Sequence, residues 1–287
     1  MNLKSDCLSC LLNQSLRVSK NLNLDENSSK EMMKVALASI ALYEDVTPPV
    51  AAADLYPKLA KFVGKEDIYR ELKADSTKEA MRLLPSVEKR VYSSSNRLHA
   101  AIKAAVAGNV IDFATPNHFD LDIEFEKVFE TPFALDDEEL FIERLNGAKS
   151  FMLIGDNVGE HVFDKLFLKV MRELYPKLKL YYAVRGTPII NDVTLMEAKE
   201  IEMQEVANVV DSGVITPGLA YEYASSSFMR LYNSMDLIVA KGMGNYECLE
   251  GVKNDKIFHL FKVKCDVVSR DVEAKLGSLI FMKNRSC

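Results

Sequence analysis

The chain has 287 residues, 48% of them apolar and 9% aromatic, so it is long enough for a large hydrophobic core or for two domains that share an interface. Its 36 basic and 42 acidic residues give a net charge of −6, which provides no positive field to attract nucleic acid or an anionic membrane. Because no apolar run approaches the roughly 20 residues of a membrane span, and because polar residues interrupt the N-terminal segment where a secretory signal is apolar, we expect a cytoplasmic protein without a nucleic-acid or membrane partner.

Apolar residues recur at helical spacing through residues 1–115, and no alternating strand pattern appears there, which predicts a helical domain. The expected helices cover residues 8–16, 28–43, 50–63, 67–84 and 97–107, with a serine cap on the second and Asp67 as the cap of the fourth. The Thr47-Pro48-Pro49 sequence separates the second helix from the third, because proline suits the first turn of a helix and disrupts its interior. For the same reason we expect Pro85 to end the fourth helix.

Residues 116–147 are acidic and carry no clear pattern, so we interpret them as a connection to a second domain, residues 148–287. In this domain short apolar runs alternate with helical patterns, which predicts βαβ units and a mostly parallel sheet. The expected strands cover residues 151–154, 179–184, 206–210, 237–240, 257–261 and 279–282, and the helices between them cover residues 158–175, 194–203 and 220–232. The predicted fold class is α/β, with the helical part packed on a three-layer core.

Two polar residues, Asp156 and Asn157, follow the first expected strand of the second domain, where a ligand usually binds in an open α/β sheet. Carboxylate and amide oxygens are ligands for a hard cation, and neither His nor Cys stands with them. This chemistry favours Mg²⁺ or Mn²⁺ over a zinc site of the His and Cys kind. The alternative is that one of the two residues only caps the next helix.

A second acidic residue, Asp192, follows the next expected strand in the sequence RGTPIINDVT. The carboxyl ends of parallel strands meet at one edge of a sheet, so Asp192 can converge with Asp156 and Asn157 on one ion. Capping of the following helix by Asn191 or Asp192 is again the alternative.

A third polar corner, Lys241-Gly242-Met243-Gly244-Asn245, follows the strand expected at residues 237–240. Lys241 would neutralise a phosphate, and the two glycines would let main-chain N–H groups approach it closely. A glycine-rich turn after a strand is often only a turn. The phosphate-binding interpretation is therefore supported mainly by the two other polar corners at the same edge of the sheet.

The motifs GDNVGE, RGTPIINDVT, MDLIVAKGMGNYECLEG, AVAGNVIDF and CLSCLLNQ extend over nearly the whole chain. Together they resemble the damage-control phosphatase family, which was long catalogued as a domain of unknown function and includes the acidic-residue methyltransferase-like proteins. Cys7 and Cys10 in the last motif match the paired cysteines of the stand-alone microbial branch.

The resemblance implies a metal-dependent phosphatase that hydrolyses phosphomonoesters of small metabolites, such as sugar phosphates or related damaged or surplus phosphometabolites. It implies a divalent ion, Mg²⁺ or Mn²⁺ with Co²⁺ and Ni²⁺ as alternatives, held by Asp156, Asn157 and Asp192. The substrate-binding residues it implies are Asn109, Glu160, Lys241, Gly242, Gly244 and Asn245. Residues 67–80 depart from the family's pattern, which puts a substrate contact from that helix in question.

The expected mechanism is hydrolysis with Asp156 and Lys241 as the catalytic residues. The ion would bind a phosphate oxygen, while Lys241 and the glycine N–H groups would offset the charge on the phosphoryl group. The attacking oxygen comes either from a water activated at the metal or from Asp156 itself through an aspartyl-phosphate, and the sequence leaves both routes open.

Two other functions also suit the pattern. An S-adenosylmethionine-dependent carboxyl methyltransferase would use an α/β sheet, although no GxGxxG-like loop follows the first strand. A noncatalytic metal-binding or metabolite-binding protein would keep the site without the reaction. Cys7 and Cys10 supply only half of a zinc site, so they are either small core residues or have a metal or redox role.

Overall fold

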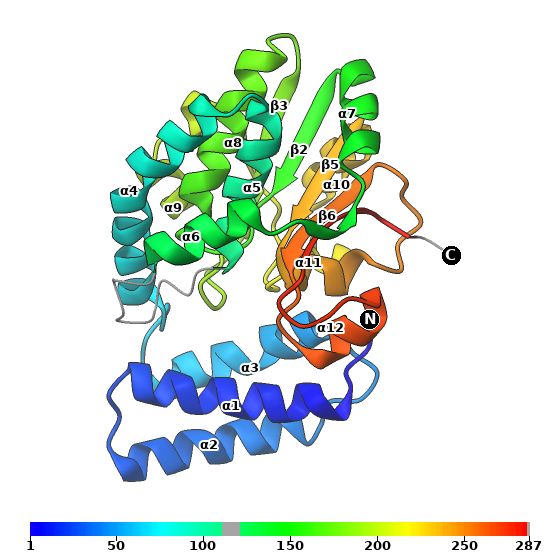
Figure 1. The fold of residues 1–287 in the computed structure, drawn as a ribbon. Helices are drawn as coiled ribbons and strands as arrows, with labels where there is room; N and C mark the ends of the chain where they lie inside the picture. Colours follow the sequence, from blue (N-terminus) through cyan, green and yellow to red (C-terminus); the bar gives the residue numbers. More distant parts are fainter. Residues whose placement is uncertain (111–120, 286–287) are drawn as a thin grey trace.

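The first three helices form a bundle at the bottom of the view in Figure 1. The structure, a computed structural model, describes residues 1–110 and 121–285, and of residues 109, 110 and 121–124 it describes only the main chain. The bundle helices are α1 (Ser5–Asn21), α2 (Glu26–Ile40) and α3 (Pro48–Val63). The carboxylate of Asp25 accepts hydrogen bonds from two N–H groups of α2, which is why this helix begins before the serine cap that the sequence predicts.

The other helices of the N-terminal half cover the sheet and do not extend the bundle. They are α4 (Arg70–Ser93) and α5 (Arg97–Val110), which pack against α8 (Glu160–Leu174). The helical part predicted for residues 1–115 therefore contains a separate bundle and two helices of a sheet layer. The predicted connection, residues 116–147, contains α6 (Leu121–Glu130), β1 (Phe133–Asp136) and α7 (Glu138–Gly147).

Pro85 lies inside α4 and does not end it, contrary to the prediction from the sequence. The helix continues to Ser93 because Val87 and Val91, beyond the proline, are buried in the core that α5 and α8 share. These apolar contacts compensate for the one helical hydrogen bond that proline removes.

In the described parts of the chain, seven strands form one sheet in the order β1-β7-β6-β5-β2-β3-β4, and only the β6 and β7 pair is antiparallel. Besides β1 they are β2 (Ser150–Ile154), β3 (Lys179–Val184), β4 (Asn208–Asp211), β5 (Leu237–Lys241), β6 (Ile257–Lys262) and β7 (Leu279–Lys283). All six strands expected from the sequence are present. The strand order reverses direction beside β2, so its carboxyl end is the switch point where α/β sheets bind ligands.

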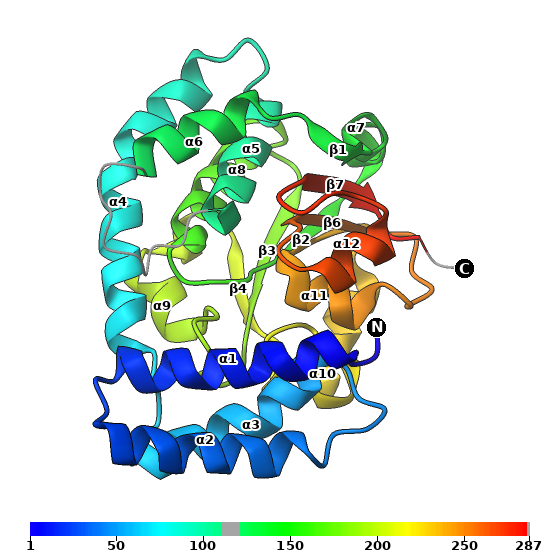
Figure 2. The same cartoon turned by 60° about the horizontal axis from the view of Figure 1, so that its bottom comes forward.

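Alternate residues of the strands point to opposite faces, and both faces are covered (Figure 2). Phe151 and Leu153 pack in the core under α5 and α8, whereas Met152 and Ile154 pack in the core on the other face. The remaining α-helices of the described residues are α9 (Leu195–Glu200), α10 (Ser226–Ser234), α11 (Gly242–Leu249) and α12 (Asp266–Val272). No helix in the described ranges is long and apolar enough to cross a membrane.

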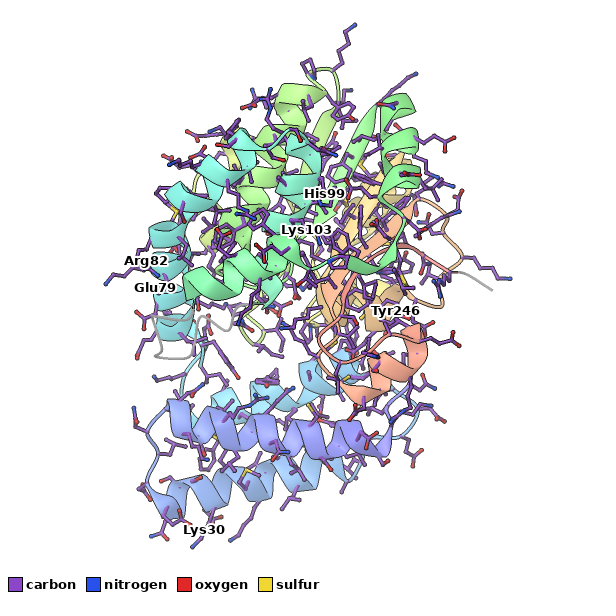
Figure 3. All side chains as sticks on the ribbon, viewed as in Figure 1. Lys30, Glu79, Arg82, His99, Lys103 and Tyr246 are labelled. Atoms are coloured by element: carbon purple, nitrogen blue, oxygen red, sulfur yellow. The ribbon has the colours of Figure 1, made fainter. Side chains whose placement is uncertain are left out.

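Two side chains of α5 anchor this helix to the β1 edge of the sheet, and Figure 3 labels both of them. His99 Nδ1 lies 2.6 Å from a carboxylate oxygen of Glu138 on α7, and Lys103 Nζ lies 3.9 Å from the ring centre of Phe133 on β1. The segment that the sequence assigned to a connection is therefore part of the layered core.

Phe141 on α7 is expected to be a main contributor to stability. Its side chain is 0% exposed and contacts the rings of Phe151, Phe258 and Phe281. Phe141→Ala should lower the free energy of unfolding by about 3–5 kcal/mol, because it leaves a cavity that these rings cannot fill. The measurement is urea unfolding, with Phe62→Ala as control, since Phe62 is 39% exposed and its loss should change stability by only about 0.5 kcal/mol. Equal losses for the two variants would contradict this assignment of the core.

Candidate active site

The structure brings the three predicted metal ligands together at the carboxyl edge of the sheet. The corner after β2 and the loop after β3 are joined by two main-chain hydrogen bonds, Val158 N to Asn191 O at 2.8 Å and Val193 N to Asp156 O at 2.9 Å. These bonds set Asn157 opposite Asp192 as an isolated antiparallel bridge. The corner and the loop thus hold Asp156, Asn157 and Asp192 side by side.

The amide of Asn157 is oriented by two carboxylates. Its Nδ2 donates to Asp156 Oδ2 and to Glu160 Oε1, each at 2.8 Å. Because both N–H groups of the amide are engaged, its carbonyl oxygen is the atom that remains to accept a cation. This oxygen, with the carboxylates of Asp156 and Asp192, forms the donor set that Mg²⁺ and Mn²⁺ prefer.

Arg185, the residue directly after β3, contacts both of the predicted carboxylate ligands. Its Nε donates to Asp192 Oδ2 at 2.8 Å, and its Nη2 lies 3.9 Å from Asp156 Oδ1. The side chain is 1% exposed, and neither Nη atom has a hydrogen-bond partner in the part of the chain that the structure describes. This role of Arg185 was not predicted from the sequence, although a basic residue at the end of a buried strand was an available signal.

Lys241 lies beneath the edge, enclosed by two acidic residues of α8. It is 0% exposed, and its Nζ donates to Glu160 Oε2 at 3.0 Å and to Asp164 Oδ1 at 2.5 Å. Tyr182 OH donates to the other oxygen of Asp164 at 2.9 Å. Burial alone lowers the pKa of a lysine, but the carboxylates of Asp164 and Glu160 raise the pKa of Lys241 above its ordinary value, so Lys241 is charged at neutral pH.

The buried charges at this edge do not balance, and the imbalance fits a divalent cation. They are the carboxylates of Asp156, Glu160, Asp164 and Asp192, and the cations of Arg185 and Lys241. Four carboxylates against two cations leave two excess negative charges when all are ionised. Burial, followed by the nearby carboxylates, raises the pKa of Asp156 well above its ordinary range, and burial raises the pKa of Asp192 to about 6. A bound divalent ion would offset the repulsion between these carboxylates and stabilise their charged forms.

A cleft of about 860 Å³ opens between this edge and the helical bundle. Its lining includes Asp156, Asn157 and Asp192 from the edge, Cys7, Cys10 and Arg17 from α1, and Lys264 from the loop before α12. The predicted metal ligands are therefore the acidic end of a cleft whose opposite wall is α1.

The other predicted substrate-binding residues take several positions. Gly244 lines the cleft, whereas Glu160, Lys241, Gly242 and Asn245 are buried and do not line it. Gly242 has a φ of 78°, and a Cβ there would lie 1.9 Å from Asp156 Oδ2, so only glycine lets the carboxylate sit over the start of α11.

Asn245 connects main-chain segments behind the site. Its side chain bonds to Gly155 O, Lys241 O and Leu219 N, which ties the ends of β2 and β5 to the loop before α10. The side chain of Asn109 lies outside the described residues.

The paired cysteines, Cys7 and Cys10, line the cleft together with Cys265, and none of the three forms a disulfide. Burial raises the pKa of each of these thiols. Within the described ranges, no group of three or more His, Cys, Asp and Glu side chains is placed to hold a metal ion. A metal site at the edge would therefore combine two carboxylates with the Asn157 amide.

A family model described as Damage-control phosphatase ARMT1-like domain matches residues 3–280. The chain belongs to the damage-control phosphatase family. A damage-control phosphatase of Pyrococcus horikoshii is 31% identical over 288 residues, with 99% of each chain covered. A damage-control phosphatase of Archaeoglobus fulgidus is 28% identical over 287 residues, with 98% of each chain covered.

The fold has a close structural relative in a DUF89 family protein from Pyrococcus horikoshii. Its crystal structure matches with a TM-score of 0.91 and 31% identity, covering 99% of this chain and 100% of that chain. The family and the α/β fold class predicted from the sequence are confirmed. Membership of the family supports an enzyme with phosphatase activity on damaged metabolites.

Replacement of Lys241 tests whether its charge holds the site together. Lys241→Met should lower the free energy of unfolding by about 3–5 kcal/mol, because Glu160 and Asp164 then remain buried without a cation. Urea unfolding in the presence of a chelator measures the effect. The control is Lys169→Met, since the Lys169 pair with Glu88 is solvent-exposed and should contribute less than about 1 kcal/mol. A Lys241→Met protein as stable as the control would show that Lys241 has no structural role.

Proposed function

We propose that the protein is a metal-dependent phosphatase that hydrolyses phosphomonoesters of small metabolites, such as sugar phosphates or related damaged metabolites. One observation carries the proposal beyond family membership: among the described residues, the carboxylates of Asp156, Glu160, Asp164 and Asp192 exceed the cations of Arg185 and Lys241 by two charges beside the cleft. The neighbouring buried pair of Lys73 and Glu197 adds one charge of each sign and leaves this excess unchanged. A divalent ion would neutralise this excess and present a positive centre to the phosphate of a substrate in the cleft.

The proposed ion is Mg²⁺ or Mn²⁺, with Co²⁺ and Ni²⁺ as alternatives, and its ligands are Asp156, Asn157 and Asp192. When bound, it would supply a Lewis acid that polarises a phosphate oxygen. Arg185 orients Asp192 through the bond from its Nε, and Lys241 orients Glu160, which in turn holds the Asn157 amide. The site is thus supported by a second set of buried ion pairs.

The substrate phosphate would meet positive groups from both walls of the cleft. Lys264 and Arg17 line the cleft, whereas Lys241 is enclosed and acts on the phosphate through its charge. The two Nη atoms of Arg185 are buried donors that an oxygen atom bound at the edge can use. These groups would offset the charge that develops on the phosphoryl group.

Two routes for the attacking oxygen remain part of the proposal. In the first route Asp156 would attack phosphorus and displace the alcohol of the ester, and water would then hydrolyse the aspartyl-phosphate to inorganic phosphate and the free carboxylate. In the second route a water in the cleft would attack phosphorus and displace the same alcohol in one step. Trapping a phosphoenzyme at Asp156 by rapid acid quench would establish the first route.

The proposal predicts phosphate release from a panel of sugar phosphates by the protein loaded with Mg²⁺, Mn²⁺, Co²⁺ or Ni²⁺. Asp192→Ala should lower this activity on the order of a hundredfold or more, because it removes one of two carboxylate ligands. The control is Asp211→Ala, since Asp211 ends the neighbouring strand β4 but does not line the cleft. Circular dichroism checks that both variants are folded.

Normal turnover by folded, metal-loaded Asp192→Ala would refute the site. No phosphate release by the wild-type protein with any of the four metals would favour a noncatalytic metal-binding or metabolite-binding protein. Tight binding of S-adenosylmethionine in calorimetry would favour the methyltransferase.

A further inference from the structure

The loop that carries Asp192 has two anchors. On one side it packs into the α1–α3 bundle, and on the other side it is linked to the segment that leads out of the bundle into α4. We propose that Lys73 is a positioning residue for Asp192, and that it couples the docking of the α1–α3 bundle to the geometry of the metal site. This inference rests on the proposed function for the identity of the site, but its test measures metal binding directly.

Lys73 lies in the first turn of α4, next to the segment that leads out of the bundle. Its side chain is 2% exposed, and its Nζ donates to Asp67 Oδ2 at 3.0 Å and to Glu197 Oε1 at 3.2 Å. Asp67 belongs to the connection between α3 and α4, where its other oxygen accepts a hydrogen bond from Tyr69 N at 2.8 Å. One buried lysine therefore joins this connection to α9 on the core.

Glu197 transmits this contact to the loop of the metal ligand. Its Oε2 accepts hydrogen bonds from Thr194 N at 2.9 Å and from Thr194 Oγ1 at 2.5 Å, which completes a capping box at the start of α9. Although burial opposes ionisation, the charge of Lys73 and the Thr194 bonds lower the pKa of Glu197. The main chain of Thr194 also forms an isolated parallel β-bridge with that of Arg185, whose side chain donates a hydrogen bond to Asp192.

The other side of the same loop is inserted into the bundle. Ile189 is buried in the apolar cluster formed by residues such as Leu11 and Leu55, and Ile190 packs against that cluster. Ile190 has a φ of 46°, in the left-handed region that β-branched residues avoid. A strained conformation of this kind persists only where the surroundings enforce it. The bundle therefore constrains the main chain two residues before Asp192.

Asp192 thus lies between two anchors, the Ile189–Ile190 contact with the bundle and the Lys73 contact at its exit. A shift of the bundle would move both anchors, and with them the carboxylate. Since α1 is also the opposite wall of the cleft, substrate access and metal geometry would change together. By linkage, a metal ion that binds only the aligned site must also stabilise the docked bundle.

The test is calorimetric titration of the chelator-treated, full-length protein with Mn²⁺. Lys73→Met should weaken Mn²⁺ binding by about tenfold, as expected when support for a ligand is lost. Asp67→Asn should cause a smaller loss, because Lys73 keeps its bond to Glu197, and Lys73→Arg should restore part of the affinity. The control is Lys58→Met on α3, which removes an exposed pair with Asp54 and should leave the affinity unchanged.

The sign of the effect distinguishes positioning from simple electrostatics. Loss of a nearby positive charge would by itself strengthen the binding of a cation. Unchanged or tighter Mn²⁺ binding by folded Lys73→Met would therefore overturn the proposal. If Lys73→Met fails to fold, Asp67→Asn decides the question, and an affinity equal to that of the wild type would overturn it.

Hydrogen exchange provides a second readout that a purely structural role would not alter. Mn²⁺ should slow amide exchange in residues 64–69 and 186–191 of the wild type and have little effect in Lys73→Met. Equal protection in the two proteins would contradict the coupling. A wild type that binds Mn²⁺ but releases no phosphate would refute the proposed function alone, whereas a wild type that binds no Mn²⁺ would refute both proposals.

Discussion

The structure depends most on a group of buried charges at the carboxyl ends of β2, β3 and β5. Arg185 lies between a carboxylate of the corner after β2 and one of the loop after β3, and Lys241 at the end of β5 lies between two carboxylates of α8. Together they fix the start of α8 and the Asp192 loop against the ends of these strands. Buried ion pairs of this kind contribute little net stability, but removing one member is costly. Their main effect is geometric: they keep Asp156, Asn157 and Asp192 together at the carboxyl edge of the sheet, where the three residues line the cleft.

The rest of the fold places a cleft over these groups. The α5 and α8 layer closes the sheet from one side, and a Cβ at Gly108 of α5 would lie 2.8 Å from the Cα of Glu160, so the two helices meet at the site itself. The α1–α3 bundle forms the facing wall of the cleft. Ile189, from the loop that carries Asp192, is buried in the apolar core of this bundle. The acidic end of the cleft would recruit a cation, and the basic residues of its walls would receive the phosphate.

The sequence predicted what depends on local pattern. Continuous apolar runs identified six strands, and the rule that parallel strands end at one edge brought Asp156, Asn157 and Asp192 together correctly. The sequence did not predict β1, whose four residues lie in an acidic segment. The predicted α4 ended at Pro85, because packing beyond the proline leaves no local signal.

The partners of the buried charged residues could not be predicted from the sequence, because Lys241 lies 81 positions from Glu160 along the chain and Lys73 lies 124 positions from Glu197. Two local signals of such burial were Asp164, one turn after Glu160 on a largely apolar helix face, and Arg185 at the end of a buried strand.

We propose that the charge excess at this edge marks a divalent-metal site. Calorimetric titration of the chelator-treated protein with Mn²⁺ tests it most directly: we predict one ion per chain, lost in the Asp156→Asn/Asp192→Asn double variant. Equal Mn²⁺ binding by the folded double variant, or none by the wild type, would contradict it.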